Sequence, residues 1–211
     1  MKRSWMGSTL VLAVIAVIAV AAVAATPASA AKRTCKAKHS STIAQNRSVR
    51  VYEVAKDDGS TLYGCRKSNG RKYKLDTASD DGFTESDTYD RVRLNGTQVA
   101  WVSTLTDQSC KADCPPGFDP TTVRIGVADV KARTSRSVPA EPVGDALVVT
   151  TTGAVAWAAG PGAGVTEIHA SIRGAEDQVV DTGAIDAASL GVELTIISWT
   201  RDGVERFARL R

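Results

Sequence analysis

His169 is the residue best suited to acid–base chemistry in this 211-residue chain. It lies in a stretch of alternating apolar and polar residues that predicts a strand, where it shares a face with Glu167 and Ser171. A serine, a histidine and a carboxylate are the groups of a hydrolytic triad. Side chains two residues apart on a strand stand roughly 7 Å apart, however, which is beyond hydrogen-bonding reach. We therefore treat His169, Glu167 and Ser171 as a candidate polar site and predict no catalytic residue.

An acidic catalytic site is the alternative, and it requires the fold to bring Asp129 or Asp177 to His169. The chain has no Walker phosphate loop, dinucleotide fingerprint or zinc-binding His-Glu-x-x-His motif. A Cys-x3-Cys pair with His39 or His169 is a metal alternative, but no second pair of cysteines has ligand spacing. We predict no cofactor and no metal site.

Four cysteines follow the first thirty residues of the chain: Cys35, Cys65, Cys110 and Cys114. An even number of cysteines in an exported chain predicts disulfide bonds. The sequence allows three connectivities. We favour Cys35 with Cys65 and Cys110 with Cys114, because the second pair precedes a Pro-Pro-Gly sequence in a predicted loop that a short bridge would stiffen.

The first thirty residues have the pattern of a secretory signal peptide. Lys2 and Arg3 form a basic start, residues 10–25 are uniformly apolar, and Ala28 and Ala30 are the small residues that precede a cleavage site. Sixteen helical residues extend only about 24 Å, less than the roughly 30 Å core of a membrane. We predict cleavage after residue 30 and secretion. The alternative is a membrane protein anchored by residues 10–25.

Charge is nearly balanced over the chain but unevenly distributed along it. The 26 Lys and Arg side chains against 23 Asp and Glu give +3, and removal of the signal peptide leaves 24 against 23. That excess is too small to predict nucleic-acid binding. Residues 31–50 hold basic and no acidic side chains, which predicts a solvated arm or a segment attracted to an anionic envelope polymer. Residues 76–90 hold acidic and no basic side chains, which predicts an acidic surface loop. A calcium site is the alternative, but Asp76, Asp80, Asp81 and Gly82 do not have the ligand spacing of an EF-hand loop.

The exported chain reads as a series of strands. Residues 49–54, 122–127 and 166–173 alternate apolar and polar side chains, and Asn-Gly or Asp-Gly pairs between such runs predict hairpin turns. We count twelve to fourteen strands, with one or two helical turns at most in residues 184–190. The predicted organisation is a signal peptide (1–30), a basic arm (31–48) and an all-β domain of antiparallel hairpins (49–211).

Four predicted strands share a short apolar core that ends in an aromatic residue: Tyr63, Trp101, Trp157 and Trp199. The intervals between them are 38, 56 and 42 residues, and the longest contains the loop of residues 110–120. Without that insertion the period is roughly 40 to 45 residues, as in the blades of β-propellers. We expect the three tryptophans to be core residues and not a platform for stacking a ligand.

This pattern resembles the uncharacterised secreted β-propeller-like proteins of bacteria that contain WD40-like or TolB-like repeats. The resemblance covers residues 49–211 and implies an antiparallel β-repeat fold of three to four blades, either closed or an open stack. The chain departs from regular repeats in lacking their Gly-His and Trp-Asp signatures. A β-sandwich is the alternative fold. An open stack would leave strand edges that favour a homodimer.

These features predict a secreted, non-catalytic β-repeat protein that binds or scaffolds at the cell envelope. Its partner would be an unknown ligand or an envelope polymer. A secreted hydrolase or lyase with an acidic site in a propeller-like funnel is one alternative. A signal-anchored membrane protein is the other, and only in that case is the membrane a partner.

Overall fold

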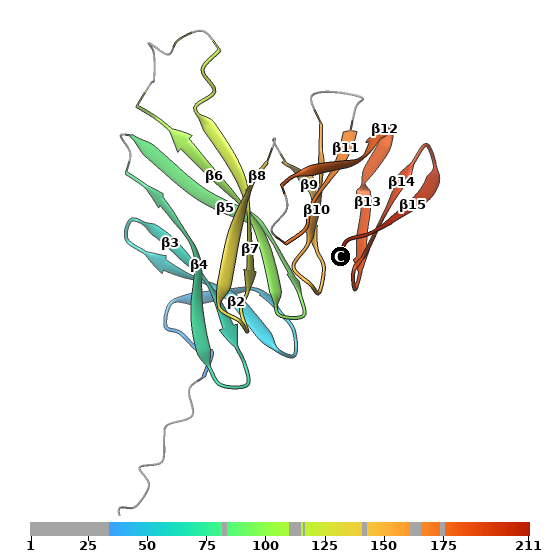
Figure 1. The fold of residues 1–211 in the computed structure, drawn as a ribbon. Coiled ribbons are helices and arrows are strands. Elements are labelled where there is room, and N and C mark those ends of the chain that lie inside the picture. Colours follow the sequence, from blue (N-terminus) through green and yellow to red (C-terminus); the bar gives the residue numbers. More distant parts are fainter. Residues whose placement is uncertain are drawn as a thin grey trace, which may run out of the picture. The chain divides into compact units, whose positions relative to one another are not determined.

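The computed structural model describes residues 34–81, 84–109, 115, 117–140, 143–160, 166–173 and 176–211. All of them belong to one compact unit, Lys32–Arg211. In these residues the chain forms fifteen strands and no helix (Figure 1). The fold is therefore all-β, as the alternating pattern predicted.

The strands form three antiparallel sheets, and each strand pairs with its neighbours in the chain. The first sheet contains β1 (Ser40–Gln45), β2 (Val49–Lys56), β3 (Gly59–Arg66), β4 (Arg71–Asp80), β5 (Glu85–Asn95), β6 (Gln98–Asp107), β7 (Thr121–Asp129) and β8 (Thr134–Pro139). The second contains β9 (Val143–Val149), β10 (Val155–Ala159), β11 (Thr166–Ser171) and β12 (Gln178–Gly183). The third contains β13 (Ile185–Glu193), β14 (Ile196–Arg201) and β15 (Val204–Arg209).

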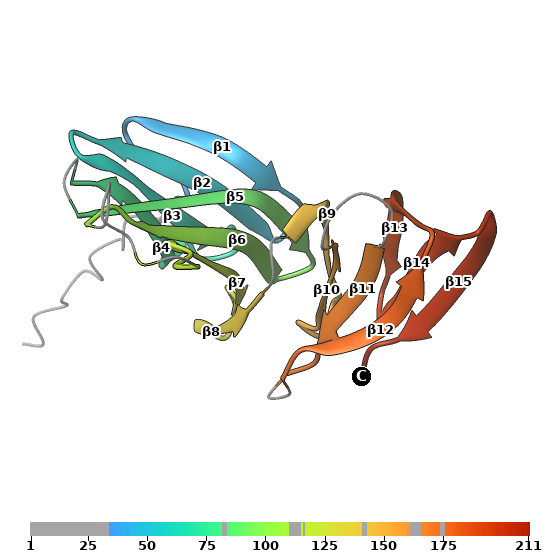
Figure 2. The same ribbon diagram turned by 90° about the horizontal axis from the view of Figure 1, so that it is seen from above.

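The eight-stranded sheet is divided near its middle. Among the described residues, β4 and β5 pair through Ser79 with Asp87 and Asp80 with Ser86. By contrast, β5 pairs with β6 along nearly its whole length. Strands β1–β4 and β5–β8 are thus two four-stranded groups that share one corner, and Figure 2 shows them beside the strands of the other two sheets. The second sheet is a third group of four, and the last group has three strands.

Three buried apolar clusters pack these groups against one another, and each cluster contains one tryptophan. Trp101 on β6 packs with residues of β2 and β3. Trp157 on β10 packs with residues of β6, β7 and β8. Trp199 on β14 packs with residues of β10 and β11. All three are buried, as a core role requires. The clusters lie between successive groups, so the chain is a series of four strand groups with three interfaces.

The aromatic pattern needs one correction. Trp101, Trp157 and Trp199 each lie on the second strand of their group, whereas Tyr63 lies on the third strand, β3. The aromatic residue on the second strand of the first group is Tyr52, which is buried and stacks on Tyr63 across the β2–β3 pair. Sequence spacing selected Tyr63 because a turn glycine precedes both it and two of the tryptophans.

Three other expectations differ from the structure. Strand β1 lies inside the predicted arm, so the sheet begins at Ser40 and not at residue 49. The predicted acidic loop is largely strand, in β4 and β5, because β4 pairs with β3 and β5 pairs with β6 through these residues. The predicted helical turns are strand β13, whose small residues pack onto the second sheet. Tertiary packing decides the conformation of such alanine-rich segments.

The predicted signal peptide lies outside the described residues. Within the part of the chain that the structure describes, no helix is long and apolar enough to cross a membrane.

Candidate functional site

His169 on β11 holds both of its ring nitrogens against carboxylates. Nδ1 lies 3.0 and 2.8 Å from the two carboxylate oxygens of Asp177, and Nε2 lies 2.9 Å from Oε2 of Glu167. The imidazole is buried and stacks on the indole of Trp157, with ring centroids 5.4 Å apart. Only the imidazolium form can donate from both nitrogens at once. The geometry is therefore that of one imidazole held between two carboxyl groups.

The structure corrects the expected reach of these side chains. Glu167 does contact His169 although it is two residues away, since the glutamate side chain is long enough to bring its carboxylate to Nε2. Ser171 accepts a hydrogen bond from Nη1 of Arg136 at 2.9 Å. The fold thus brings His169, Glu167 and Asp177 together and places the Ser171 hydroxyl on an arginine.

This cluster is better suited to holding strands together than to catalysis. A general base needs a ring nitrogen that faces the substrate with its lone pair free, and both nitrogens of His169 face protein carboxylates. Asp177 precedes β12, so its bond to His169 ties the start of that strand to β11. Of the predicted polar site, Glu167 contacts His169, whereas Ser171 is bonded to Arg136 and Asp177 takes the remaining place beside the imidazole.

A hydrogen bond between a tryptophan indole and an aspartate occurs in two of the interfaces between strand groups. The indole N–H of Trp101 donates to Asp76 on β4 at 2.5 Å, and that of Trp199 donates to Asp181 on β12 at 2.8 Å. In both cases the last strand of one group supplies the aspartate and the second strand of the next group supplies the tryptophan. The indole nitrogen of Trp157, in the interface between these two, is buried without a hydrogen-bond partner.

The Asp181 carboxylate should make stability depend on pH. Burial raises its pKa, but hydrogen bonds from the Trp199 indole and the Arg201 guanidinium outweigh burial and hold the pKa below its usual range. Stability from a lowered carboxylate pKa is complete above the unfolded value, about 4, and is lost as pH falls through the folded value. We expect Asp181→Asn to cost about 1–2 kcal/mol at pH 7 and progressively less below about pH 4. Urea unfolding of both proteins at neutral and acid pH measures this. A difference in unfolding free energy between the two proteins that stays the same at neutral and acid pH would contradict this role of Asp181.

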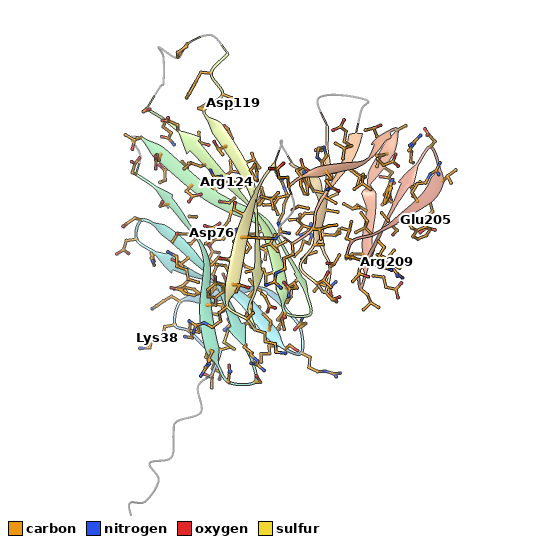
Figure 3. All side chains as sticks on the ribbon, viewed as in Figure 1. Lys38, Asp76, Asp119, Arg124, Glu205 and Arg209 are labelled. Atoms are coloured by element: carbon orange, nitrogen blue, oxygen red, sulfur yellow. A yellow bond between two sulfur atoms is a disulfide. The ribbon has the colours of Figure 1, made fainter. Side chains whose placement is uncertain are left out.

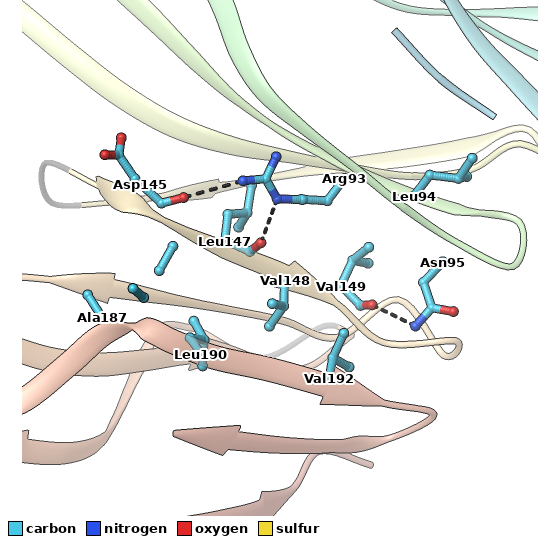
Figure 4. A pocket seen from close by; sticks show the side chains of 12 residues that line it. Arg93, Leu94, Asn95, Asp145, Leu147, Val148, Val149, Ala187, Leu190 and Val192 are labelled. Carbon is cyan, nitrogen blue, oxygen red and sulfur yellow. Dashed lines mark hydrogen bonds between the residues drawn. The ribbon is translucent and has the colours of Figure 1, made fainter. Parts of the chain in front are cut away.

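A groove lies over the first strands of three groups, β5, β9 and β13 (Figure 4). Its volume is about 700 Å³. Arg93 donates from Nε to the carbonyl of Leu147 at 3.1 Å, and Asn95 donates from Nδ2 to the carbonyl of Val149 at 3.0 Å. These bonds attach β5 to the unpaired edge of β9 and engage the side chains of Arg93 and Asn95 in the groove wall. The remaining lining is mostly small and apolar, and its one carboxylate, Asp145, is fully exposed.

The two ends of the eight-stranded sheet carry opposite charge. The turns β1–β2, β3–β4, β5–β6 and β7–β8 lie at one end and contain four basic residues and no acidic one: Arg47, Lys67, Lys131 and Arg133. The connections at the other end contain aspartates, among them Asp57, Asp58, Asp81 and Asp119. Figure 3 shows Asp119 toward the second of these ends. We call the first of them the basic end.

The basic end includes a hollow of about 620 Å³ lined by Thr34, Gly70, Arg71, Lys72 and Arg133. The β7–β8 turn approaches the β3–β4 hairpin there, since the hydroxyl of Tyr73 donates to Oγ of Ser135 at 2.9 Å. Asp129 at the base of the turn accepts hydrogen bonds from the N–H groups of Lys131 and Ala132. Its carboxylate is thus engaged with backbone at the turn.

Two arginines of the basic end face each other directly. Arg66 and Arg71 are cross-strand partners at the closed end of the β3–β4 hairpin, and Lys72 lies opposite Cys65 next to them. Like charges directly opposite each other destabilise a pair of strands. A sequence that breaks a local rule in this way is typical of a functional surface, because an anionic ligand would relieve the repulsion.

The disulfide between Cys35 and Cys65 joins the N-terminal segment to this end of the sheet. Arg50 donates from Nη1 to the carbonyl of Cys35 at 2.7 Å, and Lys72 donates from Nζ to the carbonyl of Lys36 at 3.3 Å. The predicted Cys35–Cys65 pairing is confirmed, and it fits an oxidising extracellular compartment. Cys110 and Cys114 lie outside the described residues.

No protein-family model and no curated protein matches this chain. Among solved structures, one from a structural and mechanistic analysis of two prolyl endopeptidases is similar, with 19% identity and a TM-score of 0.46. The match covers 84% of this chain and 30% of that one, so this chain spans about a third of its length. We draw nothing about activity from a likeness of that size.

Sequence reasoning missed the residues of the basic end: Arg66, Lys67, Arg71, Lys72, Lys131 and Arg133. The signal was present, because residues 59–75 and 130–140 contain no acidic side chain. Their combined charge becomes apparent only when the antiparallel register places alternate turns at the same end of the sheet.

Proposed function

We propose that this protein is a secreted, non-catalytic binding module that holds a polyanionic polymer of the cell envelope at its basic end. The observation that carries the proposal is the Arg66–Arg71 cross-strand pair beside the hollow of Arg71, Lys72 and Arg133. Exposed cations in several adjacent turns suit a repeating anion, since each contact releases counterions and the contributions add along the polymer.

The extracellular location is part of the same proposal. The Cys35–Cys65 disulfide and the predicted signal peptide both support export into an oxidising compartment. A polymer that lies outside the cell and carries phosphate or carboxylate groups would meet the basic end there. Lysine and arginine both bind such groups, and arginine does so in a planar, bidentate geometry.

We further infer a propeller-like architecture of four blades: β1–β4, β5–β8, β9–β12 and β13–β15. Each group is an antiparallel meander, and the first strands contact one another in order, β1 with β5, β5 with β9 and β9 with β13. First strands at the centre and last strands outside are the arrangement of propeller blades. The apolar clusters between successive groups support the same interpretation.

The geometry favours binding over the hydrolase alternative. His169 does approach Asp177, as an acidic catalytic site would require, but each of its nitrogens faces a carboxylate. It also lies on β11, whereas the groove of Figure 4 is lined by β5, β9 and β13. The groups with acid–base character are thus separate from the largest hollow described.

Binding to fluorescein-labelled poly(glycerol phosphate), measured by anisotropy, tests the function. We expect the logarithm of the affinity to fall linearly with the logarithm of the salt concentration. The variant R71E/K72E/R133E should bind about 100-fold more weakly, because three attractive contacts become repulsive. Dextran of similar length is the neutral control and should not bind.

A matched variant separates a local site from net charge. K38E/K56E/R124E makes the same change in net charge at exposed positions toward the opposite end of the sheet. It should bind within about threefold of the original protein. Equal losses in the two triple variants would contradict a site at the basic end. Tighter binding to duplex DNA than to the polymer would contradict the envelope assignment.

A further inference from the structure

The last strand, β15, presents an unusually exposed edge. Val204 and Phe207 are 54% and 63% exposed, and Glu205 and Arg206 between them are exposed as well. The group it belongs to has three strands, whereas the other three groups have four. Strand β15 pairs with β14 on one side and ends the sheet on the other. A free edge with large apolar side chains is a template for pairing with another strand.

The hydrogen bonds of β15 identify which residues face outward. The N–H of Leu210 donates to the carbonyl of Thr195 at 2.8 Å, and a two-residue turn joins Arg201 to Val204. Backbone groups alternate along a strand, so those of Val204, Arg206 and Ala208 face β14. The backbone groups of the residues between them point away from the sheet: Glu205, Phe207 and Arg209.

This outward row is complementary to itself. In an antiparallel pair of two β15 strands centred on Phe207, the two phenylalanines lie opposite each other. Glu205 of each strand then lies opposite Arg209 of the other. The backbone groups of Glu205, Phe207 and Arg209 all point away from β14, so they can bond to this partner strand. Figure 3 shows Glu205 and Arg209 on this strand. Opposite charges and aromatic pairs in such positions each stabilise the pairing of strands.

We propose that β15 binds a second copy of this chain, forming a symmetric dimer through an antiparallel β15–β15 pair centred on Phe207. The charge pattern argues for a second copy, because a twofold axis through Phe207 satisfies both ion pairs with one sequence. Pairing two six-residue edges buries less surface than a standard interface. We therefore expect a dissociation constant of roughly 10–100 µM. The dimer does not depend on polymer binding.

Sedimentation velocity from about 5 µM to about 500 µM tests the dimer. The original protein should shift from monomer to dimer over this range. Glu205→Arg alone and Arg209→Glu alone should each remain monomeric, because like charges then face each other twice. The double variant E205R/R209E should dimerise again, since it restores both pairs in exchanged positions.

A matched control places the interface on β15. Val179 on β12 is also an apolar residue more than half exposed, so V179K should dimerise like the original protein, whereas F207K should not. A protein that stays monomeric up to about 500 µM would overturn the proposal. So would failure of E205R/R209E to dimerise while its circular dichroism shows that it is folded, or a loss of the dimer in V179K.

Discussion

Alanine in place of Gly126 is expected to lower the free energy of unfolding by about 3 kcal/mol. Gly126 on β7 lies directly opposite Trp101 on β6, and the indole lies over the glycine. A Cβ atom at position 126 would stand 2.1 Å from Cε2 and 2.2 Å from Cζ2 of that ring. The ring cannot move away easily, because it is buried and its N–H is bonded to Asp76.

Urea unfolding followed by circular dichroism measures this cost. Gly144→Ala is the control, because the added Cβ would meet a single carbonyl oxygen at 3.3 Å at an exposed position. In the background W101L, where the ring is gone, G126A should cost less than about 1 kcal/mol. An unchanged urea midpoint for G126A in the original protein would show that Trp101 does not occupy this position.

The parts of the fold that follow local rules were predictable from the sequence. Alternating residues predicted strands, and the Asp202-Gly203 turn between β14 and β15 has the positive φ angles, 52° and 75°, that this dipeptide favours. The core role of Trp157 followed from the apolar strand around it. Strand β13 could not be assigned locally, since a short run of alanine, serine and leucine is compatible with either helix or strand.

The chemistry of the surface depends on pairing between distant segments, which the sequence does not show. Asp177 reaches His169 because β11 and β12 pair with a bulge, and no spacing rule predicts a bulge. The basic end requires Arg71 and Arg133 to meet, 62 positions apart in the sequence, which follows from the register of the eight-stranded sheet. Charge runs were visible in the sequence, but their position in space was not.

The two proposed surfaces would reinforce each other. Strand β15 belongs to the last strand group and the basic end to the first two, so their residues do not overlap. A dimer therefore carries two basic ends. If one polymer reaches both, the second contact is intramolecular and the apparent affinity rises without any new residue. The variant F207K should then bind long polymers more weakly than the original protein and bind short ones equally.

Reduction of the Cys35–Cys65 disulfide is expected to lower the free energy of unfolding by about 3–4 kcal/mol. The bond closes a loop of residues 30 apart in sequence, and it joins the N-terminal segment to β3 at a position where Cys65 is fully buried. Loss of the bond raises the conformational entropy of the unfolded chain. It also detaches from the sheet the N-terminal segment whose Thr34 lines the hollow. The variant C110S/C114S isolates this bond, because its other cysteines are absent. Its urea midpoint should fall when dithiothreitol is added.

The same reduced protein separates stability from binding. Arg71, Lys72 and Arg133 stay on the sheet when the disulfide opens, so poly(glycerol phosphate) affinity under folded conditions should fall by less than about tenfold. In the C110S/C114S background, the further changes C35S and C65A should give the stability and affinity of the reduced protein, and dithiothreitol should not change them further. Equal urea midpoints for the oxidised and reduced C110S/C114S proteins would mean that the N-terminal segment contributes no stability through this bond. The segment would then be an appendage of the sheet, and the hollow would have to be formed by the two turns alone.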